Sequence, residues 1–175
     1  DAVFFSRLDP LDFAQEGHRV ELASDEPNAP LVFKGVVFNE MKGAMSSVSS
    51  VLWDRLCFEL FPTNTYHHNS GGDPEAIPDL SYDELMAFYK GHYHPSNAIL
   101  LTFGNLPVAQ HHDAFESRAL NRFEKSKEVI EVHLEQSFEA PKRATHRYAL
   151  DDSDAADKTH LIMGWKLGES SDLDA

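Results

Sequence analysis

Histidine is the residue type with catalytic or metal-binding chemistry that stands out in this sequence, with ten copies in 175 residues. These include two adjacent pairs and one alternating pair, namely His67-His68, His111-His112 and His92-Tyr93-His94. Adjacent histidines on a helix point about 100° apart and cannot share a metal ion, whereas an alternating pair on a strand can. His94 precedes a proline, and no carboxylate lies within a few residues of this alternating pair. We therefore expect His92 and His94 to cap or pack and not to bind metal.

The common signature motifs of catalysis are missing from the sequence. Neither HExxH nor HxxEH occurs, and the nearest approach, His18 to Glu21, lacks the second histidine. There is no GxSxG, P-loop or GxGxxG motif. The single cysteine, Cys57, excludes an intrachain disulfide and a cysteine-based zinc cluster, and its apolar neighbours predict a buried, unreactive thiol. Spacing alone thus identifies no active site.

The amino-acid composition excludes some classes of binding partner. Hydrophobic residues are 42% and charged residues 25%, which is typical of a globular protein. A formal net charge of −14 opposes binding to the phosphates of nucleic acid. No apolar run approaches the roughly 18 residues of a membrane helix. We expect neither nucleic acid nor membrane as a partner, and the acidic balance favours cationic ones.

The elements that position these residues are predicted to be mainly helical in the first part of the chain. Residues 1–30 show no sustained period, and we expect irregular chain there. A helical stripe follows from about Phe33, formed by Val36, Val37, Met41 and Ala44. A second helix is predicted from a cap at Ser49 or Ser50 to Phe61, and a long structured loop then follows.

Later segments alternate between helix and extended chain. Ser81 with Glu84 three residues on forms a capping box at the start of a third helix. An apolar run at 97–104 predicts a buried strand, and a fourth helix is expected over 108–123. The polar stretch 124–143 indicates a linker. Beyond it, two alternating segments around an aspartate-rich turn predict a hairpin over Thr145 to Gly168. The fold class is α+β.

Two long runs resemble a known family. LVFKGVVFNEMKGAMSS, and then SGGDPEAIPDLSYDELMAFYKGHYHPSNAILLTFGNLP, are similar to the pitrilysin/insulinase family of zinc metallopeptidases, in particular its presequence-protease branch. The resemblance implies four homologous α+β domains, with helices packed on mainly antiparallel sheets and two halves enclosing a chamber. Residues 1–123 would then be the C-terminal part of the first metallopeptidase domain, 124–143 a linker, and 144–175 the truncated start of a second similar domain.

The same resemblance suggests one metal ligand in this chain. Zinc in the family is held by both histidines of HxxEH and by a glutamate on a later helix, which matches Glu40 within GVVFNEMKG. Glu40 follows Val36 by four residues and Val37 by three, so we expect it on or beside the apolar stripe, where a carboxylate needs a partner. An exposed helical glutamate is the alternative. No catalytic residue and no other cofactor ligand is assigned.

The implied function belongs to a longer protein. HxxEH is expected upstream of Asp1, and one carboxylate cannot form the open three-ligand site of catalytic zinc. We therefore expect one zinc ion per full-length enzyme, weak zinc affinity in this chain and no activity from it alone. The expected partners are the remaining domains of the same polypeptide and short unfolded peptides of the targeting-peptide type. Acidic stretches at Asp1 to Pro30 and Asp151 to Asp157 favour cationic ones.

Two other classes of function stay open. The parent protein could be a non-catalytic structural or assembly member of the same family. It could instead be a peptide-binding module that lends a sheet edge to an extended strand, which needs no metal, so that binding would survive a chelator.

The expected location is the cytoplasm for a bacterial protein, or the mitochondrial or plastid matrix for a eukaryotic one.

Overall fold

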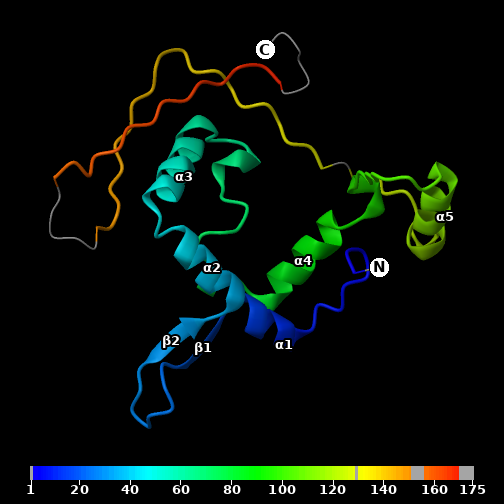
Figure 1. Ribbon diagram of the computed structural model, residues 1–175, viewed down its shortest axis with the longest axis horizontal. Helices are drawn as coiled ribbons and strands as arrows, with labels where there is room; N and C mark the ends of the chain where they lie inside the picture. Colours follow the sequence, from blue (N-terminus) through cyan, green and yellow to red (C-terminus); the bar gives the residue numbers. More distant parts are fainter. Residues whose placement is uncertain (1, 129, 151–155, 170–175) are drawn as a thin grey trace. The chain divides into compact units, whose positions relative to one another are not determined.

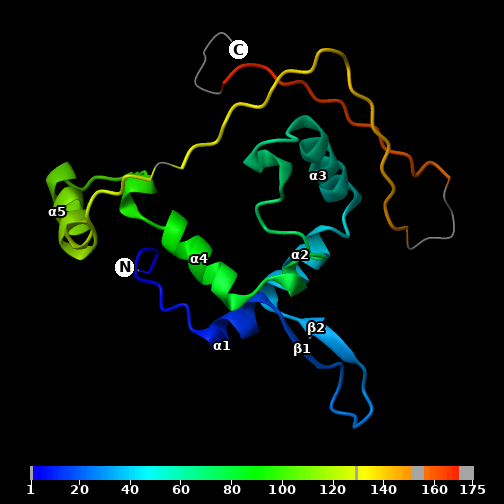
Figure 2. The same ribbon diagram turned by 180° about the vertical axis from the view of Figure 1, so that it is seen from behind.

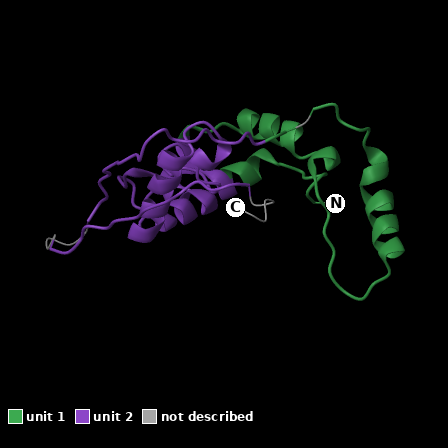
Figure 3. Cartoon of the chain, turned by 90° about the horizontal axis from the view of Figure 1, so that it is seen from above, with its two compact units in different colours: residues 1–14, 79–131 green, residues 15–78, 132–175 purple. Residues whose placement is uncertain are grey.

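The computed structural model describes residues 2–128, 130–150 and 156–169 (Figure 1). The chain forms two compact units, one of residues 1–14 with 79–131 and one of residues 15–78 with 132–175 (Figure 3). Helices and one antiparallel two-stranded sheet make up the regular structure of the described residues, which confirms the α+β class. Among these residues no helix is both long and apolar enough to cross a membrane.

The second unit contains the sheet, a β-hairpin of β1 (Arg19–Leu22) and β2 (Leu31–Lys34). Arg19 lies opposite Lys34, and the Ala23 amide donates to the Pro30 carbonyl beyond the last pair. The expectation of irregular chain over residues 1–30 was wrong here. Each strand has only four residues, which is too few for a clear alternation of apolar and polar side chains. The strands form because they pair with each other across the loop, and the sequence pattern of either segment does not show this pairing.

Two helices follow the hairpin directly, α2 (Val36–Ala44) and α3 (Val48–Leu60). Both were predicted, although α3 begins after Ser47 instead of after Ser49 or Ser50. The buried residue of α2 is Phe38, whose ring centroid lies 6.1 Å from that of Phe33 on β2. Val36 and Val37 are exposed, so the stripe expected to face a core does not do so.

A loop with two short 3-10 turns, η2 (Thr65–His67) and η3 (Ile77–Asp79), continues the chain after α3. The segment 132–150 returns to this region, where Thr63 donates from its backbone and its hydroxyl to the Glu135 carboxylate at 2.7 and 2.9 Å. Figure 2, which shows the molecule from behind, shows this extended segment running past α3. The return of the chain therefore closes this unit through polar contacts.

The predicted hairpin over Thr145 to Gly168 has no strand in its described residues, 145–150 and 156–168. Its two arms still meet, because the Tyr148 hydroxyl donates to the Lys158 carbonyl at 2.6 Å and its ring lies 5.9 Å from that of His160. The aspartate-rich turn lies largely outside the described residues. No strand among the described residues lies beside either arm, so the alternating pattern has no hydrogen-bonding ladder to join there.

The first unit is built on helices, with their bounds as follows: α1 (Pro10–Asp12), η1 (Phe13–Gly17, of which the last three residues belong to the second unit), α4 (Tyr82–His92), η4 (Pro95–Asn97), α5 (Val108–Arg118) and η5 (Leu120–Arg122). The predicted capping box of α4 is present, with the Glu84 amide donating to Ser81 Oγ at 3.2 Å and the Ser81 amide donating to the Glu84 carboxylate at 2.7 Å. Helix α5 ends at Arg118, and η5 accounts for most of the remaining residues predicted to be helical.

The strand expected over 97–104 does not form in this unit. Residues 98–103 follow η4 without regular structure, and Ile99 and Phe103 are almost fully exposed. The apolar run has no described strand beside it, so its backbone groups have no ladder partner. The packing of the unit comes instead from aromatic contacts, such as Phe123 with Phe4 at 5.9 Å.

Candidate functional site

Glu40 lies in the middle of α2 and is exposed. Its carboxylate makes no hydrogen bond or ion pair with the residues that the structure describes. The expectation that it would lie on or beside a buried stripe was wrong, because Phe38 occupies the packed face while Val36 and Val37 are themselves exposed. Glu40 thus presents two free oxygen atoms to solvent from a helix whose start is fixed on the hairpin.

The partners of Glu40 contrast with those of two other glutamates in the same unit. Glu21 accepts from Lys34 Nζ at 2.6 Å and from Arg19 Nε at 2.7 Å. These two hydrogen bonds, Lys34 first and then Arg19, lower the pKa of the Glu21 carboxyl. Glu59 likewise has two side-chain partners, Lys142 and His146. Glu40 is left available for a ligand.

The donor chemistry of Glu40 fits one position of a zinc site, since carboxylate oxygen is a regular zinc ligand. Within the described part of the chain, no group of three or more His, Cys, Asp and Glu side chains could hold a metal ion. The residues of this chain alone therefore do not fit a complete catalytic zinc site. What the geometry offers is a single ligand on a defined helix.

His92 packs and His94 caps, as predicted for the alternating histidines. His92 Nδ1 lies 2.9 Å from the Phe88 carbonyl oxygen, and its ring stacks on Phe88 at 3.9 Å. His94 Nδ1 accepts from the Ser96 amide at 3.1 Å and so caps η4, while its ring meets Phe123 edge to face. Cys57 is half-buried and not buried as predicted. Burial, followed by the nearby Asp54 charge, raises the pKa of its thiol, which agrees with an unreactive side chain.

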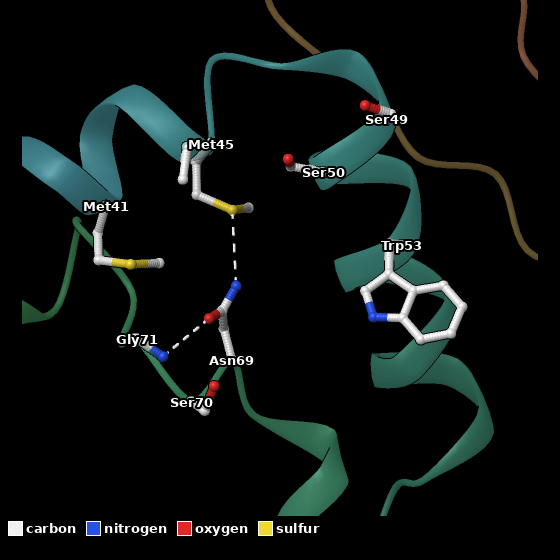
Figure 4. A pocket seen from close by; sticks show the side chains of 9 residues that line it. Met41, Met45, Ser49, Ser50, Trp53, Asn69, Ser70 and Gly71 are labelled. Atoms are coloured by element: carbon white, nitrogen blue, oxygen red, sulfur yellow. Dashed lines mark hydrogen bonds between the residues drawn. The ribbon is translucent and has the colours of Figure 1, made fainter.

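A pocket of about 500 Å³ adjoins the helix that carries Glu40. It lies between α2, α3 and the loop at 69–71, with an apolar part from Met41, Met45 and Trp53 (Figure 4). Asn69 orders its polar side, because Oδ1 accepts from the Gly71 amide at 2.9 Å. The sequence analysis missed this pocket. The four-residue spacing of the two methionines was a signal for a shared helix face, but the loop that completes the pocket could not be placed from it.

A second cluster of charged side chains joins the returning segment to the end of α3. Glu59 Oε2 lies 2.6 Å from Lys142 Nζ, and Glu59 Oε1 lies 2.8 Å from His146 Nε2. The hydrogen bond from Lys142, and after it that from His146, lowers the pKa of the Glu59 carboxyl. The cluster fixes the segment on the helix, and nothing in the sequence spacing indicated it.

Comparison with known proteins places the chain in a family. The sequence profile described as "Peptidase M16 inactive domain" matches residues 79–175, more than half of the chain. The chain therefore belongs to the M16 peptidases, the pitrilysin/insulinase family, which confirms the resemblance carried by the two long runs.

Individual relatives show which proteins the chain is similar to. The chain is 41% identical over 98% of its length to a protein of Xenopus tropicalis named "Presequence protease, mitochondrial", and 42% identical over the same share to the protein of that name in Danio rerio. It is 34% identical over 91% of its length to "Protein HypA" of Clostridium perfringens. The chain spans only 17%, 17% and 16% of the lengths of these relatives.

Proposed function

We propose that this chain is part of a zinc-dependent endopeptidase and that Glu40 supplies one carboxylate ligand to the catalytic zinc. The remaining ligands would come from other parts of a longer polypeptide, as expected for a chain that spans about a sixth of its presequence-protease relatives. When bound, zinc would supply the Lewis acid and activated water of peptide hydrolysis. This chain would contribute the ligand and the helix that presents it.

The observation that carries this proposal is the exposed carboxylate of Glu40, which has no partner among the described residues. Glu21 is held by two cationic side chains and Glu59 by a lysine and a histidine, all in the same unit. Glu40 instead stands on a helix anchored by the buried Phe38, with its oxygens directed to solvent. An unpaired carboxylate on this helix is free to bind a metal ion that other parts of the polypeptide share.

The substrates we propose are short unfolded peptides, cationic targeting peptides among them. The names of the vertebrate relatives support this class, since they describe proteases of presequences. The charge of the chain supports it independently, because a net charge of −14 attracts basic peptides. Part of the acidic sequence, residues 151–155, lies outside the described residues.

The same relatives support a mitochondrial location, and we propose the matrix.

We also propose the organisation inferred from the sequence. Residues 1–123 would complete one metallopeptidase domain, 124–143 would be a linker, and 144–175 would begin a second similar domain. The family profile matches residues 79–175 and so covers the end of the proposed first segment, the linker and the second segment. The partners of both segments would then be the remaining domains of the same polypeptide.

The proposal is tested in the full-length protein by replacing Glu40 with glutamine. We expect E40Q to remove chelator-sensitive cleavage of an unstructured peptide, since a neutral amide is a poor zinc ligand. Glu116, an exposed glutamate on α5, provides the matched control, and E116Q should cleave at the wild-type rate. Full activity of E40Q would contradict the assignment of Glu40.

A non-catalytic family member is the second candidate, because the matching profile describes an inactive domain over residues 79–175 and does not include Glu40. Such a protein would keep the fold and its partners but would not cleave any peptide, with or without added zinc. A third possibility, a module that only binds peptides, is distinguished by binding that persists in the presence of a chelator. The cleavage assay therefore separates the peptidase from the other two functions, and peptide binding in the presence of a chelator identifies the binding module.

A further inference from the structure

The second arm of the predicted hairpin, residues 161–167, has two faces of different character. Its exposure alternates from one residue to the next, as that of a β-strand does, although none of these residues is in a strand. The even-numbered residues are half-buried and the odd-numbered ones are exposed. The exposed side chains are all large and apolar, and they form the outer face of the segment: Leu161, Met163, Trp165 and Leu167, which are 83%, 68%, 73% and 79% exposed.

The opposite face of this segment packs against helix α3. A Cβ atom on Gly164 would lie 2.9 Å from Leu60 Cδ1 and 3.1 Å from Leu56 Cδ1. The backbone at Gly164 therefore lies directly on these two leucines of the helix. The segment already has one helical layer on its inner side, while no element among the described residues covers its outer face.

The single charged side chain of the segment is engaged elsewhere. Residues 161–167 contain one ionisable group, Lys166. Its Nζ atom lies 3.8 Å from the centre of the Phe138 ring and donates to the Gln136 carbonyl, so the charge is held by the segment 132–150. The four side chains of the outer face carry no charge. A cationic peptide would find no ionic partner on them, so the face fits an apolar partner better than the proposed substrates.

The dimensions of the outer face match those of one helix. Large apolar patches on the surface of a soluble protein mark contact surfaces. Seven residues of extended chain span about 20 Å. A helix of about 13 residues has the same length, and α3, which packs on the inner side, has 13 residues. A single helix with an apolar stripe is therefore long enough to contact all four side chains.

We infer that an amphipathic helix from another part of the same polypeptide covers the outer face. The inference rests on the proposal that the chain is part of a longer protein, and the chain spans only 17% of the length of two vertebrate relatives. The segment 161–167 then lies between two helical layers, α3 on one side and the further helix on the other. Burial on both faces accounts for an extended segment in which nearly every residue is apolar.

Oxidation of Met163 by dilute hydrogen peroxide, followed by peptide mass spectrometry, measures whether the outer face is covered. This readout depends neither on catalysis nor on zinc. In the chain alone we expect Met163 to oxidise about as fast as methionine in an unstructured peptide, and in the full-length protein at least about tenfold more slowly. Equal rates in the two proteins would overturn the inference. Protection of Met163 in a full-length protein that cleaves no peptide would retain the inference and contradict the proposed function.

The variant L161S tests the face itself in the full-length protein. It removes one apolar side chain from the contact with the covering helix, and we expect Met163 to oxidise about threefold faster. Leu11 is 79% exposed, close to the 83% of Leu161, but it lies on α1 in the other unit. L11S is therefore the matched control and should leave the rate unchanged. Equal acceleration in the two variants would show a general loss of stability and overturn the inference.

Photocrosslinking identifies the kind of element that covers the face. With the photoreactive benzoylphenylalanine in place of Met163, we expect crosslinks within one polypeptide, to residues three or four positions apart on a helix. Crosslinks to residues two positions apart would indicate a sheet. Crosslinks between two polypeptides would indicate a second copy, and crosslinks to an added peptide would indicate a substrate. Each of these three results would overturn the inference.

Discussion

Replacing Glu59 with glutamine should release the segment that returns onto α3. The Glu59 carboxylate contacts Lys142 Nζ at 2.6 Å and His146 Nε2 at 2.8 Å, and both partners lie on that segment. An amide keeps the shape of the side chain but not its charge. E59Q therefore weakens both contacts without opening a cavity.

The magnitude follows from the exposure of the partners. The Glu59 side chain is 21% exposed, while that of Lys142 is 44% exposed, so solvent screens a large part of the attraction. Exposed ion pairs contribute about 0.2 to 1 kcal/mol each, and the two contacts together should contribute about 1 kcal/mol. Since 1.36 kcal/mol corresponds to a factor of ten, the population of the opened segment should rise about fivefold.

The effect depends on pH in a defined direction. The hydrogen bond from Lys142, followed by that from His146, lowers the folded-state pKa of Glu59 below its ordinary value of 4.5. A carboxylate with a lowered folded pKa contributes its full stability above the unfolded pKa and loses it as pH falls through the folded value. The wild type and E59Q should therefore differ at neutral pH and converge as the pH falls through the lowered folded-state pKa of Glu59.

Trypsin cleavage after Lys142 and Arg143 under native conditions measures this opening, because cleavage follows the population of the open segment when opening is fast. At neutral pH and low salt we expect cleavage about fivefold faster in E59Q than in the wild type. Glu139 lies on the same segment, is exposed and has no described partner, so E139Q is the matched control and should be cleaved like the wild type. Equal cleavage rates in all three proteins would refute the reasoning, as would equal acceleration in the two variants.

Three further predictions concern the chain and its parent protein. The chain by itself should not cleave unstructured peptides, because one glutamate cannot hold a catalytic zinc, and chelator-sensitive cleavage that disappears in E40Q would contradict this. Limited proteolysis should cut first between Glu124 and Arg143 and leave a compact fragment ending near Phe123, whereas a first cut within Ser81 to Gly104 would disprove the proposed boundary. In the full-length protein, kcat/KM for a lysine-rich peptide should fall more steeply with salt than for a neutral analogue, because salt screens the attraction of the acidic surface. Equal salt dependence would exclude electrostatic selection.

The helices could be predicted because their signals are local. The Ser81 and Glu84 pair lies within one turn, and its capping box is present as expected. The same holds for α2, whose apolar residues repeat within nine positions. When the residues that stabilise a helix lie within the helix itself, the sequence pattern was sufficient to predict it.

Strands depended on partners that a pattern does not specify. The run at 97–104 is apolar enough for a strand but has no described neighbour, and Phe103 is fully exposed. Conversely, the short strands β1 and β2 carry weak patterns and form because they pair with each other. A ladder of hydrogen bonds is a property of two segments, so one segment alone does not decide it.

The candidate site was likewise predicted only in part. Glu40 was identified through resemblance to a family motif, while its exposure was wrongly inferred from a stripe that turned out to face solvent. The Glu59 contacts join residues 83 and 87 positions apart, and the approach of Gly35 to Gly17 joins two strand ends. Such contacts arise only when the chain has folded, which is why neither could be read from spacing.

The most direct test of the central claim is the zinc content of the full-length protein after dialysis, measured by inductively coupled plasma mass spectrometry. If Glu40 is a ligand of the catalytic metal, the wild type and E116Q should each retain about one zinc ion per chain, and E40Q should retain almost none. Full zinc occupancy in E40Q would show that Glu40 does not bind the metal.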